Sequence, residues 1–182
     1  MKKSKLTFVL GGARSGKSHY VEEYARQNGK KVLFIATATA GDAEMSLRIQ
    51  KHQASRPKNW QTLEAPLNLH SQLDQNLDSD TDMVILDCIT MLTSNILCSF
   101  PEEPDFEIFE KEVEKQTSEL LAAIRQTTAH WLVISNEIGL GIVPANAYSR
   151  SYRDALGRAN QKIAAEAEEV LFMVAGIPMK VK

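Results

Sequence analysis

The residues best suited to chemistry form the run GGARSGKS at positions 11–18. This run fits the pattern G-x-x-x-x-G-K-[ST], in which backbone N–H groups surround the phosphates of a nucleoside triphosphate. In such a loop Lys17 reaches the β- and γ-phosphate oxygens, and the hydroxyl of Ser18 holds Mg²⁺. Glycines allow the close approach of backbone to phosphate. We therefore expect the following residues to bind a nucleotide: Gly11, Gly12, Ala13, Arg14, Ser15, Gly16, Lys17 and Ser18.

A carboxylate follows a second apolar run, MVILD, which ends at Asp87. Ligands of open α/β sheets gather at the carboxyl ends of the strands. An acid there resembles the Walker B acid, which completes the Mg²⁺ environment begun by the loop serine. The alternative is that Asp87 caps a helix beginning at Ile89. The two interpretations are compatible, and we predict Ser18 and Asp87 as the metal ligands.

A third candidate is His52, which has Arg48 four residues before it and Arg56 four residues after it. On a helix this spacing places the three side chains along one face. Two guanidinium groups would bind phosphate oxygens and favour the neutral imidazole, the form that attacks phosphorus. Pro57 predicts that the helix ends at or before Arg56. The spacing alone, however, fits an ordinary surface histidine on a basic helix face equally well or better.

Two further segments carry charge near the expected nucleotide edge. The run SNEIGLGIVP, residues 135–144, leaves a strand with a lone acid, Glu137, and we expect it to face the nucleotide side of the sheet. Basic residues gather around a later helix, where they would meet a phosphate-bearing substrate, a neighbouring subunit or solvent: Arg150, Arg153, Arg158 and Lys162.

The elements that position these residues alternate between short apolar runs and amphipathic stretches. We predict buried strands at residues 6–10, 32–36, 83–88, 131–135 and 170–175, and helices at 17–27, 43–55, 66–77, 106–127 and 148–168. This order is typical of an α/β fold with a mostly parallel sheet and helices on both faces. Residues 100–105 are expected to form a surface loop. Residues 177–182 are expected to add an edge strand, with an antiparallel arrangement left open.

Length and composition limit the class of protein. A chain of 182 residues with 43% hydrophobic content predicts one domain spanning residues 1–182. Its 21 basic and 23 acidic residues give a net charge of -2, which indicates no nucleic-acid or membrane partner. Cys88 and Cys98 are interpreted as two core residues in a reducing cytosol. The basic start is followed by only five apolar residues, too few for a signal peptide or membrane span, so we expect a cytoplasmic protein.

Several blocks together resemble one family. They are GGARSGKS, IATA at 35–38, RIQKHQASRPKNW at 48–60, LDCIT at 86–90, SNEIGLGIVP at 135–144, and YRDALGRANQKIAAEAEEV at 152–170. In this order they closely resemble the bifunctional adenosylcobinamide kinase and adenosylcobinamide-phosphate guanylyltransferase family of cobalamin assembly. The likeness covers nearly the whole chain. The block around His52 is absent from P-loop proteins in general, so it makes the resemblance far more specific than the glycine loop does.

The resemblance implies a catalytic role for His52, on which the family carries GMP, beside Lys17. It implies GTP and ATP as substrates, Mg²⁺ as cofactor, adenosylcobinamide and its phosphate as partners, a RecA-like P-loop fold and a homotrimer. It also places further residues where the family holds GTP: Ala36, Thr37, Ala38, Gln53, Ala54, Ser55, Arg56, Glu64 and Asp87. Relatives often have Glu at position 87 and can have His at the position of Lys51.

Two other functions fit the glycine loop. One is a P-loop small-molecule kinase that phosphorylates and stops, with a structural His52. The other is a GTPase-like switch or RecA-type ATPase that acts through binding. The sequence lacks the N-K-x-D motif by which GTPases read guanine, and its short length argues against a motor.

Overall fold

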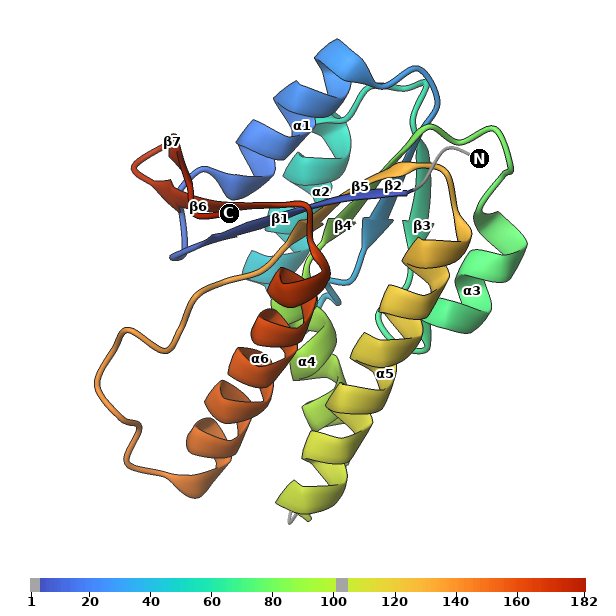
Figure 1. Cartoon of the computed structure of the whole chain (residues 1–182). Helices are drawn as coiled ribbons and strands as arrows, with labels where there is room; N and C mark the ends of the chain where they lie inside the picture. The colour runs from blue at the N-terminus through green and yellow to red at the C-terminus, as the bar shows by residue number, and fades with distance from the viewer. Residues whose placement is uncertain (1–3, 101–104) are drawn as a thin grey trace.

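Seven strands form one sheet in the part of the chain that this computed structural model describes, residues 4–100 and 105–182 (Figure 1). Their order is β3-β2-β4-β5-β1-β6-β7. β1 pairs in parallel with both β5 and β6, so the first strand lies deep inside the sheet. The strands are β1 (Lys5–Gly11), β2 (Val32–Ala36), β3 (Gln61–Glu64), β4 (Met83–Asp87), β5 (His130–Ile134), β6 (Glu169–Val174) and β7 (Ile177–Lys180).

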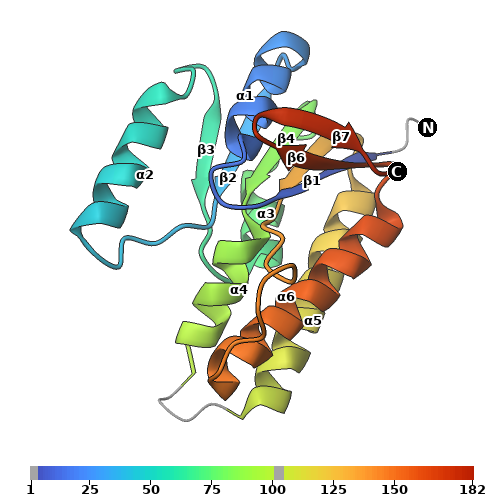
Figure 2. The same cartoon turned by 90° about the vertical axis from the view of Figure 1, so that its left-hand side faces the viewer.

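Helices cover both faces of this sheet, as the alternation of buried side chains requires. In β1, Phe8 packs with the helices of one face and Val9 with Val21 and Ala25 of the helix on the other. Figures 1 and 2 show α1 alone on its face and α3, α4, α5 and α6 together on the opposite face. The helices are α1 (Lys17–Asn28), α2 (Ala43–Ser55), α3 (Leu69–Asn76), α4 (Ile89–Cys98), α5 (Phe106–Gln126) and α6 (Ala147–Glu166).

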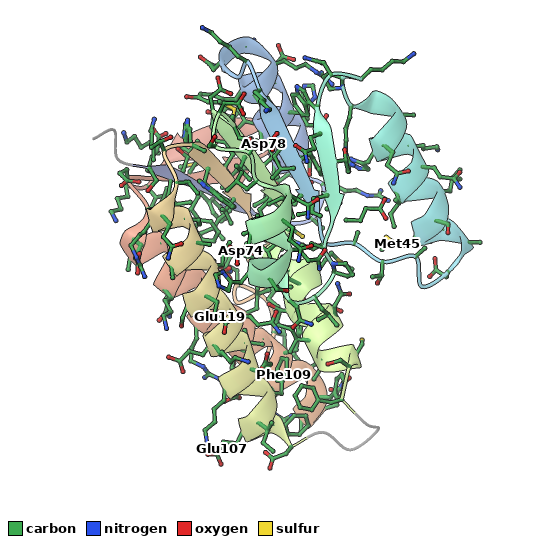
Figure 3. The ribbon with its side chains drawn as sticks, turned by 90° about the vertical axis from the view of Figure 1, so that its right-hand side faces the viewer. Met45, Asp74, Asp78, Glu107, Phe109 and Glu119 are labelled. Atoms are coloured by element: carbon green, nitrogen blue, oxygen red, sulfur yellow. The ribbon has the colours of Figure 1, made fainter. Side chains whose placement is uncertain are left out.

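Helix α2 differs from the others because it lies at the margin of the molecule, beyond β3 (Figure 2). Its side chains are exposed or half-buried wherever the structure describes them, whereas α5 buries Phe109 completely. Figure 3 shows Met45 of α2 well away from α5, which carries Glu107, Phe109 and Glu119. The side chains of Arg48 and Ser55, both on α2, lie outside the described part.

The predicted α/β architecture is confirmed, including the antiparallel edge formed by β6 and β7. Some expectations were wrong or incomplete. The strand β3 was not predicted, the helix α4 was considered only in the alternative that Asp87 caps a helix beginning at Ile89, and α3 begins at Leu69 rather than at residue 66. Cys98 is exposed rather than part of the core, although Cys88 is buried. Of the predicted loop at 100–105, residues 101–104 lie outside the described part.

Candidate functional site

The glycine loop joins β1 to α1 and is held by the turn between β6 and β7. Gly16 has a φ of 97°, a left-handed conformation that side chains disfavour. A Cβ there would also lie 3.0 Å from the Cα of Gly176. The N–H of Gly176 in turn donates to the carbonyl of Ser15 at 2.9 Å. The loop is therefore held against the turn between β6 and β7, and Gly12, Ala13 and Arg14 are exposed at the carboxyl end of β1.

Lys17 lies at the base of this loop with 8% of its surface exposed. Its Nζ donates to the carbonyl oxygens of Gly11 at 2.9 Å and Gly12 at 2.6 Å. Burial lowers the pKa of this ammonium, and the negative charge of Asp87 acts against that shift. The ammonium is thus held against loop carbonyls, which are the groups that a phosphate oxygen would replace as its partner.

Ser18 and Asp87 lie side by side, because the hydroxyl of Ser18 donates to Oδ2 of Asp87 at 2.7 Å. Cys88 is the N-cap residue of α4 and makes no capping hydrogen bond, so Asp87 does not cap that helix. Within the described ranges there is no group of three or more His, Cys, Asp or Glu that suits a metal. Mg²⁺ commonly takes one or two protein oxygens and fills its remaining positions with phosphate and water. The Ser18 hydroxyl and the Asp87 carboxylate could supply the protein oxygens of such a site.

Helix α1 also carries Glu22, one turn after Ser18, with 6% of its surface exposed. Burial raises the pKa of the Glu22 carboxyl, while the charges of His52, Arg26 and Arg56 act in the opposite direction. His52 and Arg56 therefore lie within electrostatic range of one carboxylate on the helix that follows the glycine loop. His52 itself is exposed on α2.

Arg56 leaves α2 in an extended conformation, as Pro57 predicted, and turns inward. Its guanidinium carbon lies 3.7 Å above the ring centre of Phe34. Burial lowers its pKa, and the charges of Glu22 and Asp87 oppose this. Within the described part of the chain, its Nε and Nη1 atoms are buried and have no hydrogen-bond partner. Since unpaired buried donors are costly, an anionic oxygen beside them would be stabilised.

The ends of three neighbouring strands bring other predicted residues together. In register, Ala36 faces Glu64 on one side and Asp87 on the other. Glu64 accepts a hydrogen bond from Nε2 of Gln53 at 2.8 Å, which ties α2 to β3. Thr37 is fully buried, and its hydroxyl is bonded to the backbone of Cys88. Its N–H donates to the carbonyl of Asp87 at 3.1 Å and its carbonyl accepts from Nδ2 of Asn95 at 2.7 Å, so its predicted contact with a nucleotide stays a prediction.

The remaining predicted residues are peripheral. Ala38 is half-buried after β2, and Ala54 is exposed on α2.

Sequence reasoning missed Glu22, and the signal that could have found it was its four-residue spacing from Ser18 on the buried side of an amphipathic helix. The backbone N–H of Glu137, after β5, donates to the carbonyl of Gly11 at 3.1 Å. This bond places the lone acid beside the glycine loop, as its strand-end position predicted.

The basic residues of α6 have partners of their own. Arg158 pairs with Glu110 at 2.6 Å, and Lys162 reaches Glu114 at 3.3 Å, so these two connect α6 to α5. Arg150 donates to the carbonyls of Pro144 and Ala145. Among the described residues, Arg153 has a contact of 3.5 Å with neighbouring Asp154.

No helix in the described ranges is both long and apolar enough to cross a bilayer.

Comparison with solved structures agrees with the fold. A crystal structure of the RadB recombinase matches with a TM-score of 0.50 and 17% identity, covering 92% of this chain and 73% of that one. At this identity the match concerns the fold alone, and it confirms a RecA-like P-loop sheet.

Comparison with characterised sequences is more specific. The chain is 38% identical to the bifunctional adenosylcobalamin biosynthesis protein CobU of Salmonella typhimurium, over 97% of this chain and 99% of that protein. It is 42% identical to the bifunctional adenosylcobalamin biosynthesis protein CobP of Pseudomonas aeruginosa, over 96% and 95%. The family model described as cobinamide kinase / cobinamide phosphate guanyltransferase matches residues 7–181. The chain, with its phosphate loop and its His52 helix, therefore belongs to the cobinamide kinase / cobinamide phosphate guanyltransferase family.

Proposed function

We propose that this enzyme phosphorylates the aminopropanol hydroxyl of adenosylcobinamide and then transfers GMP from GTP to the new phosphate, giving adenosylcobinamide-GDP. Membership of the family supports both activities. The observation that carries our assignment of residues is the guanidinium of Arg56 at the end of the His52 helix. It lies 3.7 Å above the ring centre of Phe34 in β2, and its buried Nε and Nη1 have no partner among the described residues. Since β2 pairs with β4, which ends at Asp87, this guanidinium lies beside the strand edge that meets the phosphate loop.

In the kinase step, the loop at residues 11–18 holds ATP or GTP by its backbone N–H groups. The substrate hydroxyl oxygen attacks the γ-phosphorus, the bond to the β,γ-bridging oxygen breaks, and the nucleoside diphosphate leaves. Lys17 stabilises the charge that develops on the γ-phosphate oxygens. Ser18 and Asp87 are suited to hold Mg²⁺, which would neutralise phosphate charge when bound.

In the guanylyl step, a ring nitrogen of His52 attacks the α-phosphorus of GTP and pyrophosphate leaves. A phosphate oxygen of adenosylcobinamide phosphate then attacks the same phosphorus and releases the imidazole. The covalent intermediate divides one difficult displacement into two easier ones. Arg56 supports this step because its buried Nε and Nη1 have no partner among the described residues. The predicted GTP contacts from Ala36 to Ala38, from Gln53 to Arg56 and at Glu64 belong to this step.

The two displacements approach different phosphorus atoms, and each requires an in-line direction. We propose that α2 shifts between them, because it buries none of its described side chains and would lose little packing. By resemblance to the family we also propose a homotrimer. We also propose a cytoplasmic location. The net charge of -2 agrees with the absence of a nucleic-acid or membrane partner.

Incubation with GTP labelled at the α-phosphorus tests the assignment. The wild-type enzyme is expected to retain a label that is acid-labile and alkali-stable, as a phosphoramidate is, and His52→Ala to retain none. The control is His19→Ala, which removes another exposed histidine next to Ser18 and should leave labelling unchanged. Label persisting on His52→Ala would show a different nucleophile. Absence of label on wild type would favour a plain kinase, and corrinoid-independent GTP hydrolysis would favour a switch.

A further inference from the structure

A cavity of about 620 Å³ lies between α6 and the segment that follows β5. In Figure 1 this segment swings away from α6 before it returns to the start of that helix. The lining includes Leu10 from β1, Glu137 from the segment, and Arg153, Gly157 and Asn160 from α6. The mechanism above uses none of these residues.

The cavity adjoins the nucleotide cradle. Leu10 directly precedes Gly11, and Glu137 is bonded to Gly11 through its backbone N–H at 3.1 Å. Leu10 packs with the core on the α6 face of the sheet, whereas the helix of the phosphate loop covers the other face. A molecule in the cavity would therefore approach the phosphates from the side opposite α1. In P-loop folds the carboxyl edge of the sheet is where ligands meet.

The lining has an unsatisfied polar group. Asn160 has 6% of its surface exposed, and its Nδ2 donates to the carbonyl of Asn136 at 3.1 Å. Its Oδ1 is buried and has no hydrogen-bond partner within the described chain. A buried amide oxygen without a donor is unfavourable, so an N–H or O–H group of a ligand would be stabilised there. Glu137 and Arg153 add one charge of each sign to the lining.

Gly157 keeps the cavity open. It lies in the interior of α6, where glycine weakens a helix relative to alanine. A Cβ at this position would meet nothing within 4 Å, so packing does not require the glycine. The segment after β5 lines the cavity with Gly139, Gly141 and Val143, and Val143 is 60% exposed. Leu140 and Ile142, which alternate with these residues and do not line the cavity, are also exposed. Such exposed apolar residues beside a polar cavity are typical of a binding surface.

We propose that this cavity binds the corrinoid acceptor, cobinamide and then its phosphate. The proposal rests on the proposed function, and it names the acceptor site that both transfer steps need. A corrinoid joins an apolar macrocycle to peripheral amide arms. Val143 contacts the macrocycle, Asn160 accepts from an amide N–H, and the aminopropanol arm points past Glu137 toward the nucleotide. Arg153, which is only weakly paired with Asp154, binds the phosphate of the intermediate.

Gly157→Leu tests the site because it fills the cavity while improving helix propensity. We expect the Kd for cobinamide, measured by equilibrium dialysis with the coloured ligand, and its KM in the kinase assay to rise at least tenfold. Labelling of His52 by GTP alone should be unchanged. The control is Ala165→Leu, which adds similar bulk to an exposed position of the same helix outside the cavity and should bind cobinamide as wild type does.

Three results would overturn the proposal: wild-type affinity in Gly157→Leu, equal loss in Ala165→Leu, or a changed oligomeric state by sedimentation, which would make the cavity an interface between copies. If Gly157→Leu does not fold, Gly157→Ala decides, with a KM expected to rise several-fold if the cavity is the site and to stay at the wild-type value if it is not. Failure of the proposed function has a separate signature, because wild-type enzyme would then lack the His52 label whatever the cavity variants bind.

Discussion

The carboxylate of Asp87 accepts a hydrogen bond from Ser18 at 2.7 Å, so two oxygen atoms are already adjacent at the foot of the phosphate loop. An amide can accept the same bond, but it is a weaker ligand for a hard cation. We expect Asp87→Asn to fold normally and to need at least about tenfold more Mg²⁺ for half-maximal kinase rate, a loss of about 1.4 kcal/mol of binding. A titration of kinase activity with Mg²⁺ measures this. An unchanged Mg²⁺ requirement would exclude Asp87 as a ligand.

Glu137 stands where the acceptor cavity meets the loop, and a carboxylate there can take the proton that the attacking hydroxyl loses. Glu137→Gln keeps the shape of the side chain. Its amide oxygen can accept the hydrogen bond that the N–H of Gly139 donates to the carboxylate of Glu137 at 2.6 Å. We expect kinase kcat to fall by about 10²–10⁴-fold, the usual contribution of a general base. Labelling of His52 by GTP should not change, since no acceptor takes part. Equal losses in both assays would instead indicate damage to the loop.

Local spacing in the sequence was enough to predict residues that the structure brings together at the foot of the phosphate loop. Lys17 and Ser18 follow from the motif, and Asp87 follows from its place at the end of an apolar run. Glu22 was not predicted, because its electrostatic relation to His52 links residues 30 positions apart in the sequence. The partnerless nitrogens of Arg56 are likewise a property of packing, and no pattern in the sequence indicates them.

At the scale of elements, α2 is held by few interactions. Its cap is Asp42, whose side chain accepts from the N–H of Met45 at 2.7 Å. Near its other end, Gln53 binds Glu64. Since α2 buries none of its described side chains, its stability depends on polar contacts such as these.

We expect Asp42→Ala to destabilise α2 locally by about 1 kcal/mol, the usual cost of losing a helix cap. Hydrogen exchange should become faster in residues 43–55 while the overall melting temperature stays within about 1 °C, because α2 contributes little to the core. The matched control is Asp105→Ala, which removes the cap of α5. That helix buries Phe109 and Leu120, so its loss of cap should lower the melting temperature of the whole molecule. Equal effects of the two variants would contradict this account.

The elements that sequence reasoning missed have weak patterns for physical reasons. In β3 only Leu63 is buried, so the strand lacks the alternation that marks a half-buried strand. Helix α4 follows β4 after a single residue and buries Ile89, Leu92 and Ile96, so its apolar residues extend the run of the strand. The strands β2 and β4 and the helix α2 have clear periods or clear stops, and their predicted bounds were correct to within one residue.

At the scale of the whole molecule, one buried histidine is expected to contribute to the loss of stability in acid. His130 begins β5, and its Nε2 lies 2.9 Å from the hydroxyl of Thr7. Burial, aided by the charge of Lys5, lowers its pKa from 6.5 to about 4. Between those values an unfolded His130 binds a proton that the folded chain excludes, so the free energy of unfolding falls as pH falls through this window.

Urea unfolding at pH 7 and pH 4.5 measures the contribution of His130. In His130→Gln, the loss of stability between the two pH values should be smaller than in wild type, although the variant starts from a lower stability at pH 7. His19→Gln, at an exposed position, should retain the wild-type loss. If His130→Gln loses as much stability as wild type on acidification, another group governs the acid response.

The position of β1 has a consequence for biosynthesis. Its neighbours in the sheet are β5 and β6, and the carbonyl of Ser15 is bonded to Gly176, about 160 residues further along the chain. During translation the phosphate-binding motif is made long before β5 and β6, the two neighbours of β1 in the sheet. We therefore expect the growing chain to lack nucleotide affinity until β6 has been made, with its apolar strand β1 unpaired during that interval.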